Sequence, residues 1–304
     1  MVLDRVDILL ATYNGEKYIQ EQLDSIFNQS YKNLRVIVRD DGSTDATLDI
    51  VKRYDVEIIE SSENLGAKMS FESLLEYALN RSNSRYFMFA DQDDVWRSDK
   101  IAKSIDRMKV IEREQEKPTP ILIHSNLHVV DESLNLIHNS FWHYSHIDPN
   151  YNSFNRLLIQ NTVTGCTMLL NRELAYLALP IANEAIMHDW WIALVASKFG
   201  KIGILNEATM DYRQHANNDT GAKGFTLAYV GQKIFADTSI SKYQRQAKAF
   251  LQHYQSQLDT DTKELIQVFT TLDKLSYLKR VIYLLKYGLL KQGSIRNIGF
   301  ILKV

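Results

Sequence analysis

Cysteine is almost absent from this sequence, and its scarcity narrows the kinds of protein to consider. Cys166 is the only cysteine in the 304 residues, so no disulfide can form within the chain. A chain of this length can bury a core large enough to fold without disulfides or a structural metal. Since an absence of disulfides is typical of reducing compartments, we expect a cytoplasmic protein.

Long apolar runs are absent too. No stretch of about 18 uncharged apolar residues occurs, so the sequence predicts no membrane-spanning helix. The first ten residues do not resemble a secretion signal, because Asp4 and Asp7 interrupt the apolar residues there. Walker and Gly-x-Gly-x-x-Gly motifs are also missing, which argues against a kinase-type or dinucleotide-binding cradle.

Acidic and basic residues nearly balance, with a net charge of −2, but they are unevenly distributed. Residues 274–304 contain seven basic residues and no acidic residue, whereas residues 1–273 contain 28 basic and 37 acidic residues. Because the basic residues gather in one apolar tail, nucleic-acid binding is not expected. The tail is compatible with two structures: a basic amphipathic segment in peripheral contact with an anionic membrane, or a helical hairpin packed on the body. It could also mediate oligomerisation.

Strand-like and helix-like segments alternate through the first two-thirds of the chain. Short apolar runs predict strands at 6–11, 34–38, 56–59 and 86–90, and later at 121–130 and 167–170. Helical spacing of apolar residues predicts helices at 19–27, 48–51, 71–79 and 101–111, the last capped by Ser98, and at 190–199. From about residue 225 the pattern is almost entirely helical. This order predicts an α/β fold with a largely parallel, doubly wound sheet.

Polar clusters follow four of the predicted strands. They comprise residues 12–16, 40–45, 64–68 and 91–94. Open α/β sheets bind ligands at the carboxyl ends of their strands, so these clusters are candidates for one ligand site. Each cluster is also compatible with an ordinary turn between a strand and a helix.

The cluster Asp91-Gln92-Asp93-Asp94 is the hardest to explain as a simple turn. Three carboxylates within four residues repel one another. A hard divalent cation with oxygen ligands removes this repulsion and can bridge to substrate phosphates. The cluster therefore predicts a Mn²⁺ or Mg²⁺ site.

Together, and in this order, the motifs resemble those of the family 2 glycosyltransferases, which have the GT-A fold. The resemblance covers roughly residues 5–220. It is carried by residues 12–15, 40–45, 64–66 and 91–94, by His188-Asp189-Trp190-Trp191, and by Tyr212-Arg213-Gln214-His215. It implies an inverting transferase with a nucleotide-sugar-binding catalytic domain at 1–222 and a helical, basic amphipathic region at 223–304.

The resemblance also implies a set of donor-binding residues. In it, Thr12, Tyr13 and Glu16 line the nucleoside pocket, and Asp41 accepts a hydrogen bond from a pyrimidine N–H. The whole implied set is Thr12, Tyr13, Asn14, Glu16, Asp41, Asn64, Gly66, Lys68, Asp91, Gln92 and Arg213. For Lys68, a solvated surface charge is the competing interpretation.

Metal ligands and a catalytic base are implied in the same way. Asp93 is the expected direct metal ligand, with Asp91 and His215 as further candidates, although Asp94 could take part instead. Asp189 matches the catalytic base of the family, and a helix N-cap is its alternative role. Many members have Glu-Asp where this chain has His188-Asp189, which puts a role for the preceding acid in doubt.

The amino-acid sequences of three motifs most resemble those of bacterial rhamnosyltransferases of cell-wall or capsular polysaccharide synthesis. These motifs are Phe-Ala-Asp-Gln-Asp-Asp-Val-Trp, His-Asp-Trp-Trp and Tyr-Arg-Gln-His-Ala-Asn-Asn. The resemblance implies dTDP-rhamnose as donor and a polysaccharide or lipid-linked glycan as acceptor. A sugar-phosphate nucleotidyltransferase and a non-catalytic nucleotide-sugar scaffold remain as alternative functions.

Overall fold

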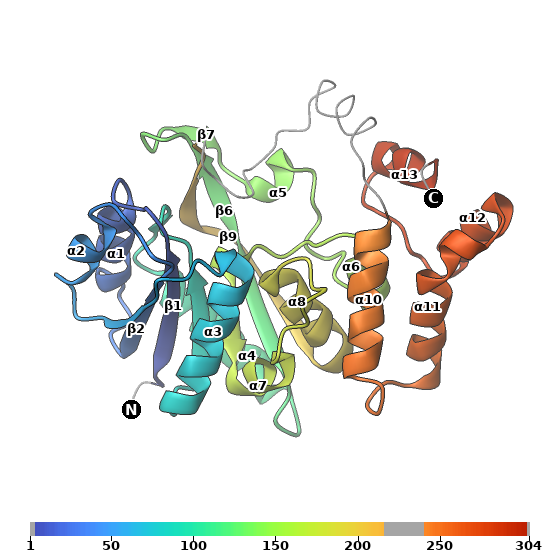
Figure 1. Cartoon of the computed structure of the whole chain (residues 1–304), viewed down its shortest axis with the longest axis horizontal. Helices are drawn as coiled ribbons and strands as arrows, with labels where there is room; N and C mark the ends of the chain where they lie inside the picture. Colours follow the sequence, from blue (N-terminus) through green and yellow to red (C-terminus); the bar gives the residue numbers. More distant parts are fainter. Residues whose placement is uncertain (1–3, 216–239, 303–304) are drawn as a thin grey trace.

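The computed structural model describes residues 4–215 and 240–302. Within these ranges the chain forms an α/β body around a nine-stranded sheet, and helices from the C-terminal part stand against one side of it (Figure 1). The strand order is β3-β2-β1-β4-β8-β6-β9-β5, with β7 beside β6. The expected α/β class, with a helical C-terminal part, is confirmed.

The first half of the sheet is parallel. It contains β1 (Val6–Thr12), β2 (Leu34–Asp40), β3 (Glu57–Glu60) and β4 (Tyr86–Ala90), connected by α1 (Ile19–Phe27), α2 (Thr47–Val51) and α3 (Gly66–Arg81). Along β1, Ile8 and Leu10 face one apolar cluster and Leu9 faces the other. Both faces are thus covered, which explains why these strands are continuous apolar runs and not alternating ones.

The second half of the sheet is mixed. Its strands are β5 (Val95–Trp96), β6 (Ile121–Val130), β7 (Leu136–His138), β8 (Leu169–Asn171) and β9 (Lys201–Arg213). The strand β8 runs antiparallel to both β4 and β6, and β6 pairs in parallel with β9. The accompanying helices are α4 (Lys100–Arg113), α5 (Phe141–Tyr144), α6 (Phe154–Leu157), the short 3₁₀ turn Gly165–Thr167, α7 (Arg172–Ala178) and α8 (His188–Phe199).

Two helical layers enclose the sheet. The apolar cluster on one face includes residues of α3, α7 and α8, and the cluster on the other includes residues of α1, α2 and α4. The first layer continues into α10 (Ser241–His253), where Phe250 and the adjoining Tyr254 contact Trp191 of α8 with ring centroids 5.5 and 6.0 Å apart. The C-terminal part therefore shares a core with the α/β body.

The remaining helices are α11 (Thr260–Thr270), the 3₁₀ turn Leu272–Lys274, α12 (Tyr277–Lys286) and α13 (Ser294–Ile301). Figure 1 shows α12 and α13 at the end of the molecule away from α1 and α2. Of the helices in the described ranges, none combines the length and apolar character needed to cross a membrane. The expected boundary at 222/223 and the start of the helical pattern at 225 lie outside the described residues.

The structure corrects two local predictions. The helix α4 begins at Lys100 after Asp99, so Ser98 is not its cap. The strand β9 was not predicted, although Ile202 and Ile204 alternate with other residues at one end and Met210 and Tyr212 do so at the other. Irregular pairing with β6 around Ser125 and Asn126 interrupts this alternation between the two ends.

Candidate active site

The polar clusters after β1 and β4 are joined by Gln92. Its Oε1 accepts hydrogen bonds from Thr12 Oγ1 (2.7 Å) and from the Tyr13 amide (2.9 Å), while its Nε2 donates to the Tyr13 carbonyl (3.1 Å). These strands are neighbours in the parallel sheet, so their ends meet. Tyr13, next to these hydrogen bonds, is 46% exposed, so its ring is available to stack on a ligand ring.

Asn14 and Glu16 bind the segment after β2. Asn14 has a left-handed backbone (φ 47°), which asparagine tolerates better than most residues, and its Oδ1 accepts from the Thr44 amide at 2.8 Å. Glu16 Oε2 accepts from the Ala46 amide at 2.9 Å, just before α2. Both side chains therefore fix the loop at the carboxyl ends of β1 and β2, and their contact with a nucleoside remains a prediction.

Asp41 is buried and oriented by three groups. It forms an ion pair with Arg39 (3.0 Å) and accepts hydrogen bonds from Ser70 Oγ (2.6 Å) and the Gly66 amide (3.2 Å). Asn64 Oδ1 also accepts from the Gly66 amide, at 2.9 Å. Gly66 has a φ of 72°, so the residue with the least strain there is glycine. Asp41, Asn64 and Gly66 thus form one unit across β2 and α3.

Lys68 contacts a different part of the molecule from the other predicted donor-binding residues. Its Nζ donates to the carbonyls of Asn183 (2.6 Å) and Ala185 (3.2 Å), in the segment that precedes α8. The ammonium group therefore ties α3 to that segment. Its predicted contact with phosphate is not tested by these interactions.

Arg213 and His215 carry the end of β9 to the acidic cluster. His215 Nε2 lies 2.7 Å from Asp93 Oδ2, and its ring stacks on Tyr18 at 4.9 Å. The Arg213 guanidinium lies 4.6 Å from the centre of the same Tyr18 ring, pairs with Glu21 and donates to the Asp93 carbonyl at 2.9 Å. Asp93 and His215, which were predicted from separate motifs, thus lie side by side.

Asp94 is completely buried within this cluster. Burial, followed by the charges of Asp93 and Asp91, raises its pKa well above the ordinary value. Its Oδ1 accepts from the Arg213 amide at 3.2 Å, and its Oδ2 has no hydrogen-bond partner among the described residues. Ligand atoms of Asp91, Asp94 and Cys166 lie within 4.8 Å of one another.

This donor set fits a hard divalent cation better than a soft one. Burial raises the pKa of the Cys166 thiol, so the sulfur stays protonated and is a poor ligand. The nearby Lys100 is also buried, which lowers its pKa to about 8, and its Nζ donates to the Cys166 carbonyl at 2.7 Å. Carboxylates and an imidazole at His215 are what remain for Mn²⁺ or Mg²⁺.

Asp189 lies in the first turn of α8 and faces the 3₁₀ turn. Its Oδ2 accepts from the Gly165 amide at 3.2 Å and Asn161 lies close enough to lower its pKa, whereas Oδ1 has no hydrogen-bond partner among the described residues. Burial raises its pKa to about 7, close to that of an effective general base at neutral pH. The helix begins at His188 after Met187, so Asp189 is not the N-cap.

His188 fills an apolar position next to Asp189. Its ring packs on Phe71 (4.3 Å) and Phe89 (4.9 Å), and burial lowers its pKa to about 3, so it is neutral. A side chain on Gly165 would approach His188 Nε2 to 2.9 Å. His188 therefore packs in the core and supports the turn that faces Asp189.

Sequence reasoning missed several residues that orient the predicted ones. They are Tyr18, Glu21, Arg39, Ser70 and Asn161. A signal existed for one of them. Arg39 and Asp41 are two residues apart at a strand end, and such residues point to the same face. The others depend on contacts between distant segments.

The chain belongs to a known enzyme family. Residues 7–175 match the model described as glycosyl transferase family 2. The chain is 25% identical over 255 residues to a teichuronic acid biosynthesis glycosyltransferase, TuaG, of Bacillus subtilis, covering 82% of this chain and 94% of that protein. It is 27% identical over 241 residues to the dTDP-rhamnosyl transferase RfbG of Shigella flexneri, covering 70% and 74%.

Solved structures show the same fold at low sequence identity. Staphylococcus aureus TarS (residues 1–349) in complex with UDP-GlcNAc is 16% identical with a TM-score of 0.54, covering 89% of this chain and 80% of that one. The mannosyltransferase PcManGT of Pyrobaculum calidifontis, in complex with GDP-Man and Mn²⁺, is 18% identical with a TM-score of 0.52, covering 94% and 74%. The GT-A fold inferred from the motifs is confirmed.

Proposed function

We propose that this glycosyltransferase is metal-dependent and inverting, and that it transfers L-rhamnose from dTDP-rhamnose to a hydroxyl of a growing, lipid-linked cell-surface polysaccharide. The observation that carries the proposal is the pairing of two sites in one fold. One is the acidic cluster with His215, and the other is Asp189, a carboxylate with a raised pKa and with one oxygen that has no hydrogen-bond partner among the described residues.

Asp189 acts as the general base in this proposal. An acceptor hydroxyl is too weakly acidic to attack unaided, so a carboxylate within hydrogen-bond reach takes its proton as the new bond forms. The acceptor oxygen bonds to the anomeric carbon while the bond from that carbon to the nucleoside diphosphate breaks. A single displacement inverts the anomeric centre, so a β-linked donor yields an α-L-rhamnoside.

Asp91, Asp93 and His215 would hold the divalent cation. When bound, the cation would stabilise the negative charge of the departing diphosphate without proton transfer. The chain's own contribution is the orientation of these ligands. Arg213 fixes the backbone of Asp93 and, with His215, packs on the ring of Tyr18. The complex of PcManGT with GDP-Man and Mn²⁺ supports this proposal.

The donor is the most specific part of the proposal. Its support is the similarity to RfbG, whose name specifies dTDP-rhamnose, together with the motif wording around Asp93 and Asp189. The test incubates the protein with Mn²⁺ or Mg²⁺ and dTDP-rhamnose, UDP-GlcNAc or GDP-mannose, and measures the released nucleoside diphosphate. We expect release with dTDP-rhamnose at least tenfold faster than with the others.

Other outcomes separate the alternatives. Turnover only with a sugar phosphate and a nucleoside triphosphate would support a nucleotidyltransferase, and nucleotide-sugar binding without turnover would support a scaffold. Asp189→Asn should slow the acceptor-dependent release of nucleoside diphosphate by about 10²- to 10⁴-fold, whereas Asp261→Asn, in the first turn of α11, should retain it.

We also propose that residues 274–304 contact the inner face of the cell membrane, where a lipid-linked acceptor would be held. Part of this tail is packed on the body, since Leu284, Leu289 and Phe300 are buried in its core. Other apolar side chains of the tail are more than half exposed, namely Leu278, Ile282, Leu285, Ile295, Ile298 and Leu302. The two structures considered for the tail are thus compatible with each other.

The spacing of these exposed residues supports a membrane as the partner. Leu278, Ile282 and Leu285 recur at i, i+4 and i+7, so they share one face of α12. Basic residues such as Lys279 and Lys286 lie on the same helix, and the tail has no acidic residue. An apolar stripe on a helix that carries basic and no acidic residues is complementary to anionic lipid.

Vesicle co-sedimentation tests this contact. We expect the protein to pellet with vesicles containing phosphatidylglycerol and several-fold less with pure phosphatidylcholine, and to be released as ionic strength rises. Ile282→Glu should reduce pelleting, while Val110→Glu, an exposed apolar position on α4, should not. Equal pelleting of both variants would contradict the proposal.

A further inference from the structure

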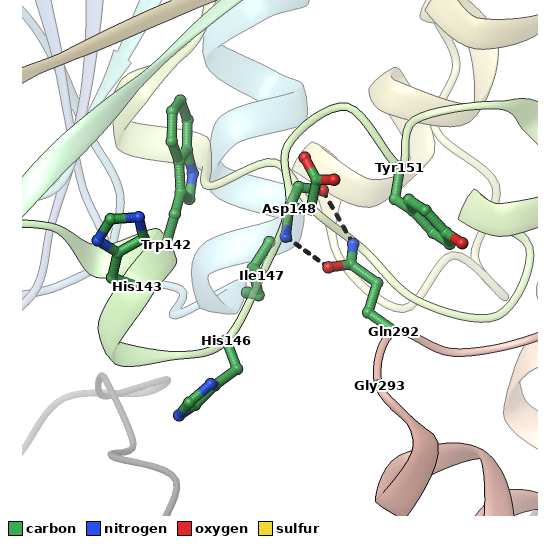
Figure 2. A pocket seen from close by; sticks show the side chains of 8 residues that line it. All are labelled: Trp142, His143, His146, Ile147, Asp148, Tyr151, Gln292 and Gly293. Atoms are coloured by element: carbon green, nitrogen blue, oxygen red, sulfur yellow. Dashed lines mark hydrogen bonds between the residues drawn. The ribbon is translucent and has the colours of Figure 1, made fainter.

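A cavity lies outside the set of predicted site residues. It has a volume of about 560 Å³ and is formed by the segment 142–151 together with Gln292 and Gly293 from the C-terminal part (Figure 2). This volume is in the range of small-molecule sites. The cavity has no wall from the segments 12–16, 40–46 or 91–94, which carry the predicted donor and metal residues.

The lining of this cavity has the chemistry of a sugar site. Figure 2 shows Tyr151 on one side and Trp142 and His143 on the other, with Asp148 between them. The C–H face of a pyranose packs on aromatic rings, and its hydroxyls require side chains that donate and accept hydrogen bonds. Tyr151, which is 39% exposed, offers the aromatic face, and the His143 imidazole and the Asp148 carboxylate offer the polar groups, whereas Trp142 is buried behind the lining at 6% exposure.

The cavity is held in shape by the C-terminal segment. The Gln292 side chain accepts from the Asp148 amide (2.5 Å) and donates to the Asp148 carbonyl (3.0 Å), as the dashed lines in Figure 2 mark. Arg296 of α13 donates to the carbonyls of Ser145 (2.5 Å) and His146 (2.7 Å). Because four hydrogen bonds already fix this wall, it does not need to become ordered when a ligand binds, which reduces the entropic cost of binding.

A short path of contacts joins the cavity to the proposed base. The Gln292 amide donates to Gln160 Oε1 at 2.8 Å, and the next residue, Asn161, lies close enough to Asp189 to lower its pKa. Gln292, in the wall of the cavity, therefore contacts Gln160, which precedes Asn161, the neighbour of Asp189. The wall of the cavity and the neighbour of Asp189 thus belong to one segment, which favours an acceptor sugar, whose hydroxyl Asp189 must deprotonate, as the ligand.

We propose that this cavity binds a sugar residue of the acceptor glycan, so that the C-terminal segment completes the acceptor site. The inference rests on the proposed transferase function and adds the location of its second substrate. It also gives the tail a role beyond membrane contact, because Gln292 and Arg296 belong to the same 274–304 segment as the exposed apolar residues.

The buried state of Cys166 allows a selective test. An introduced cysteine can be labelled with a polyethylene-glycol maleimide while Cys166 stays inaccessible. Tyr151→Cys places the label at the cavity, and Tyr176→Cys on α7 places it at an exposed tyrosine elsewhere. The probes are methyl α-L-rhamnoside and methyl N-acetyl-α-D-glucosaminide, whose binding is measured by saturation-transfer NMR, and donor hydrolysis is measured in parallel.

Labelled Tyr176→Cys should bind at least one glycoside as the unlabelled protein does, and labelled Tyr151→Cys should lose at least 90% of that signal. Hydrolysis of the nucleotide sugar by water should be the same in both. Equal glycoside signals in the two labelled proteins, or no signal in the unlabelled protein, would overturn the acceptor site. Absence of donor hydrolysis and transfer in the unlabelled protein would instead contradict the proposed function, whatever the glycoside result.

Discussion

At the scale of single residues, Asp189 leads to the clearest prediction. A general base works in its ionised form, and burial raises the pKa of this carboxyl to about 7. We therefore expect kcat/KM to rise between about pH 6 and pH 8 and then level off. Asp189→Asn should lower kcat by about 10²- to 10⁴-fold, the usual contribution of general-base catalysis. A pH–rate profile of both proteins measures this.

The raised pKa of Asp189 also predicts that stability falls as pH rises, whereas activity increases. Because folding raises the pKa of Asp189 above its ordinary value, its ionisation costs stability as pH rises toward and through 7. Asparagine has no charge to bury, and its side-chain oxygen can still accept from the Gly165 amide. Urea unfolding at pH 8 should show Asp189→Asn at least as stable as wild type. A clear loss of stability would mean that the residue is structural.

Gly15 lies where no larger residue fits without moving Gln92. A Cβ there would lie 2.3 Å from Gln92 Oε1 and 3.2 Å from Thr12 Oγ1. The Gln92 side chain can move, so Gly15→Ala should fold. The hydrogen bonds from the Gln92 side chain to Thr12 and Tyr13 would break, however. We expect the KM for the donor to rise about tenfold, equivalent to about 1.4 kcal/mol. Gly299→Ala in α13, where a Cβ meets nothing within 4 Å, is the control and should leave KM unchanged.

At the scale of elements, β9 shows what the sequence could and could not predict. The continuous apolar strands β1, β2 and β4 were predicted because each lies between two apolar layers. The alternation along β9 is broken where its pairing with β6 is irregular. His215 was still found from its motif, because the motif does not depend on the strand. Its place beside Asp93 depends on non-local pairing, which periodicity does not encode.

Arg213, at the end of β9, links this strand to α1 and to the acidic cluster. Its guanidinium contacts Glu21 and the carbonyls of Asp93 and Glu132 at the same time. A lysine ammonium cannot reproduce this planar fork. Arg213→Lys should therefore cost about 1–3 kcal/mol in unfolding free energy and reduce kcat at least tenfold.

Arg172 provides a matched control on the other side of the molecule. Its guanidinium likewise binds three groups, here the backbone carbonyls of Leu79, Ser82 and Ser84, away from the predicted site. Arg172→Lys should lose similar stability in urea unfolding but retain kcat. If both variants kept kcat, Arg213 would have a structural role alone.

At the scale of the whole molecule, the C-terminal helices belong both to the core and to the surface. Leu284 and Phe300 are buried in the cluster that contains the sheet and α8. The charge asymmetry and the apolar pattern of the tail were visible in the sequence. Which apolar residues are buried was not, because Leu284 and Leu285 are neighbours with opposite environments. Only the docking of α12 against the body distinguishes them.

Cofactor and nucleotide binding should stabilise the whole chain, because the site joins four strand ends and β9. A ligand at 100 times its Kd adds about 2.7 kcal/mol to the unfolding free energy, a shift of several degrees in Tm for a chain of this size. We expect Mn²⁺ with dTDP to raise Tm by this amount, and EDTA to reverse it. Asp93→Asn should remove the shift, since it loses a charged ligand and the pairing with His215, whereas Asp261→Asn should keep it. A shift produced by dTDP alone, and unchanged in Asp93→Asn, would show that the nucleotide binds without the cation.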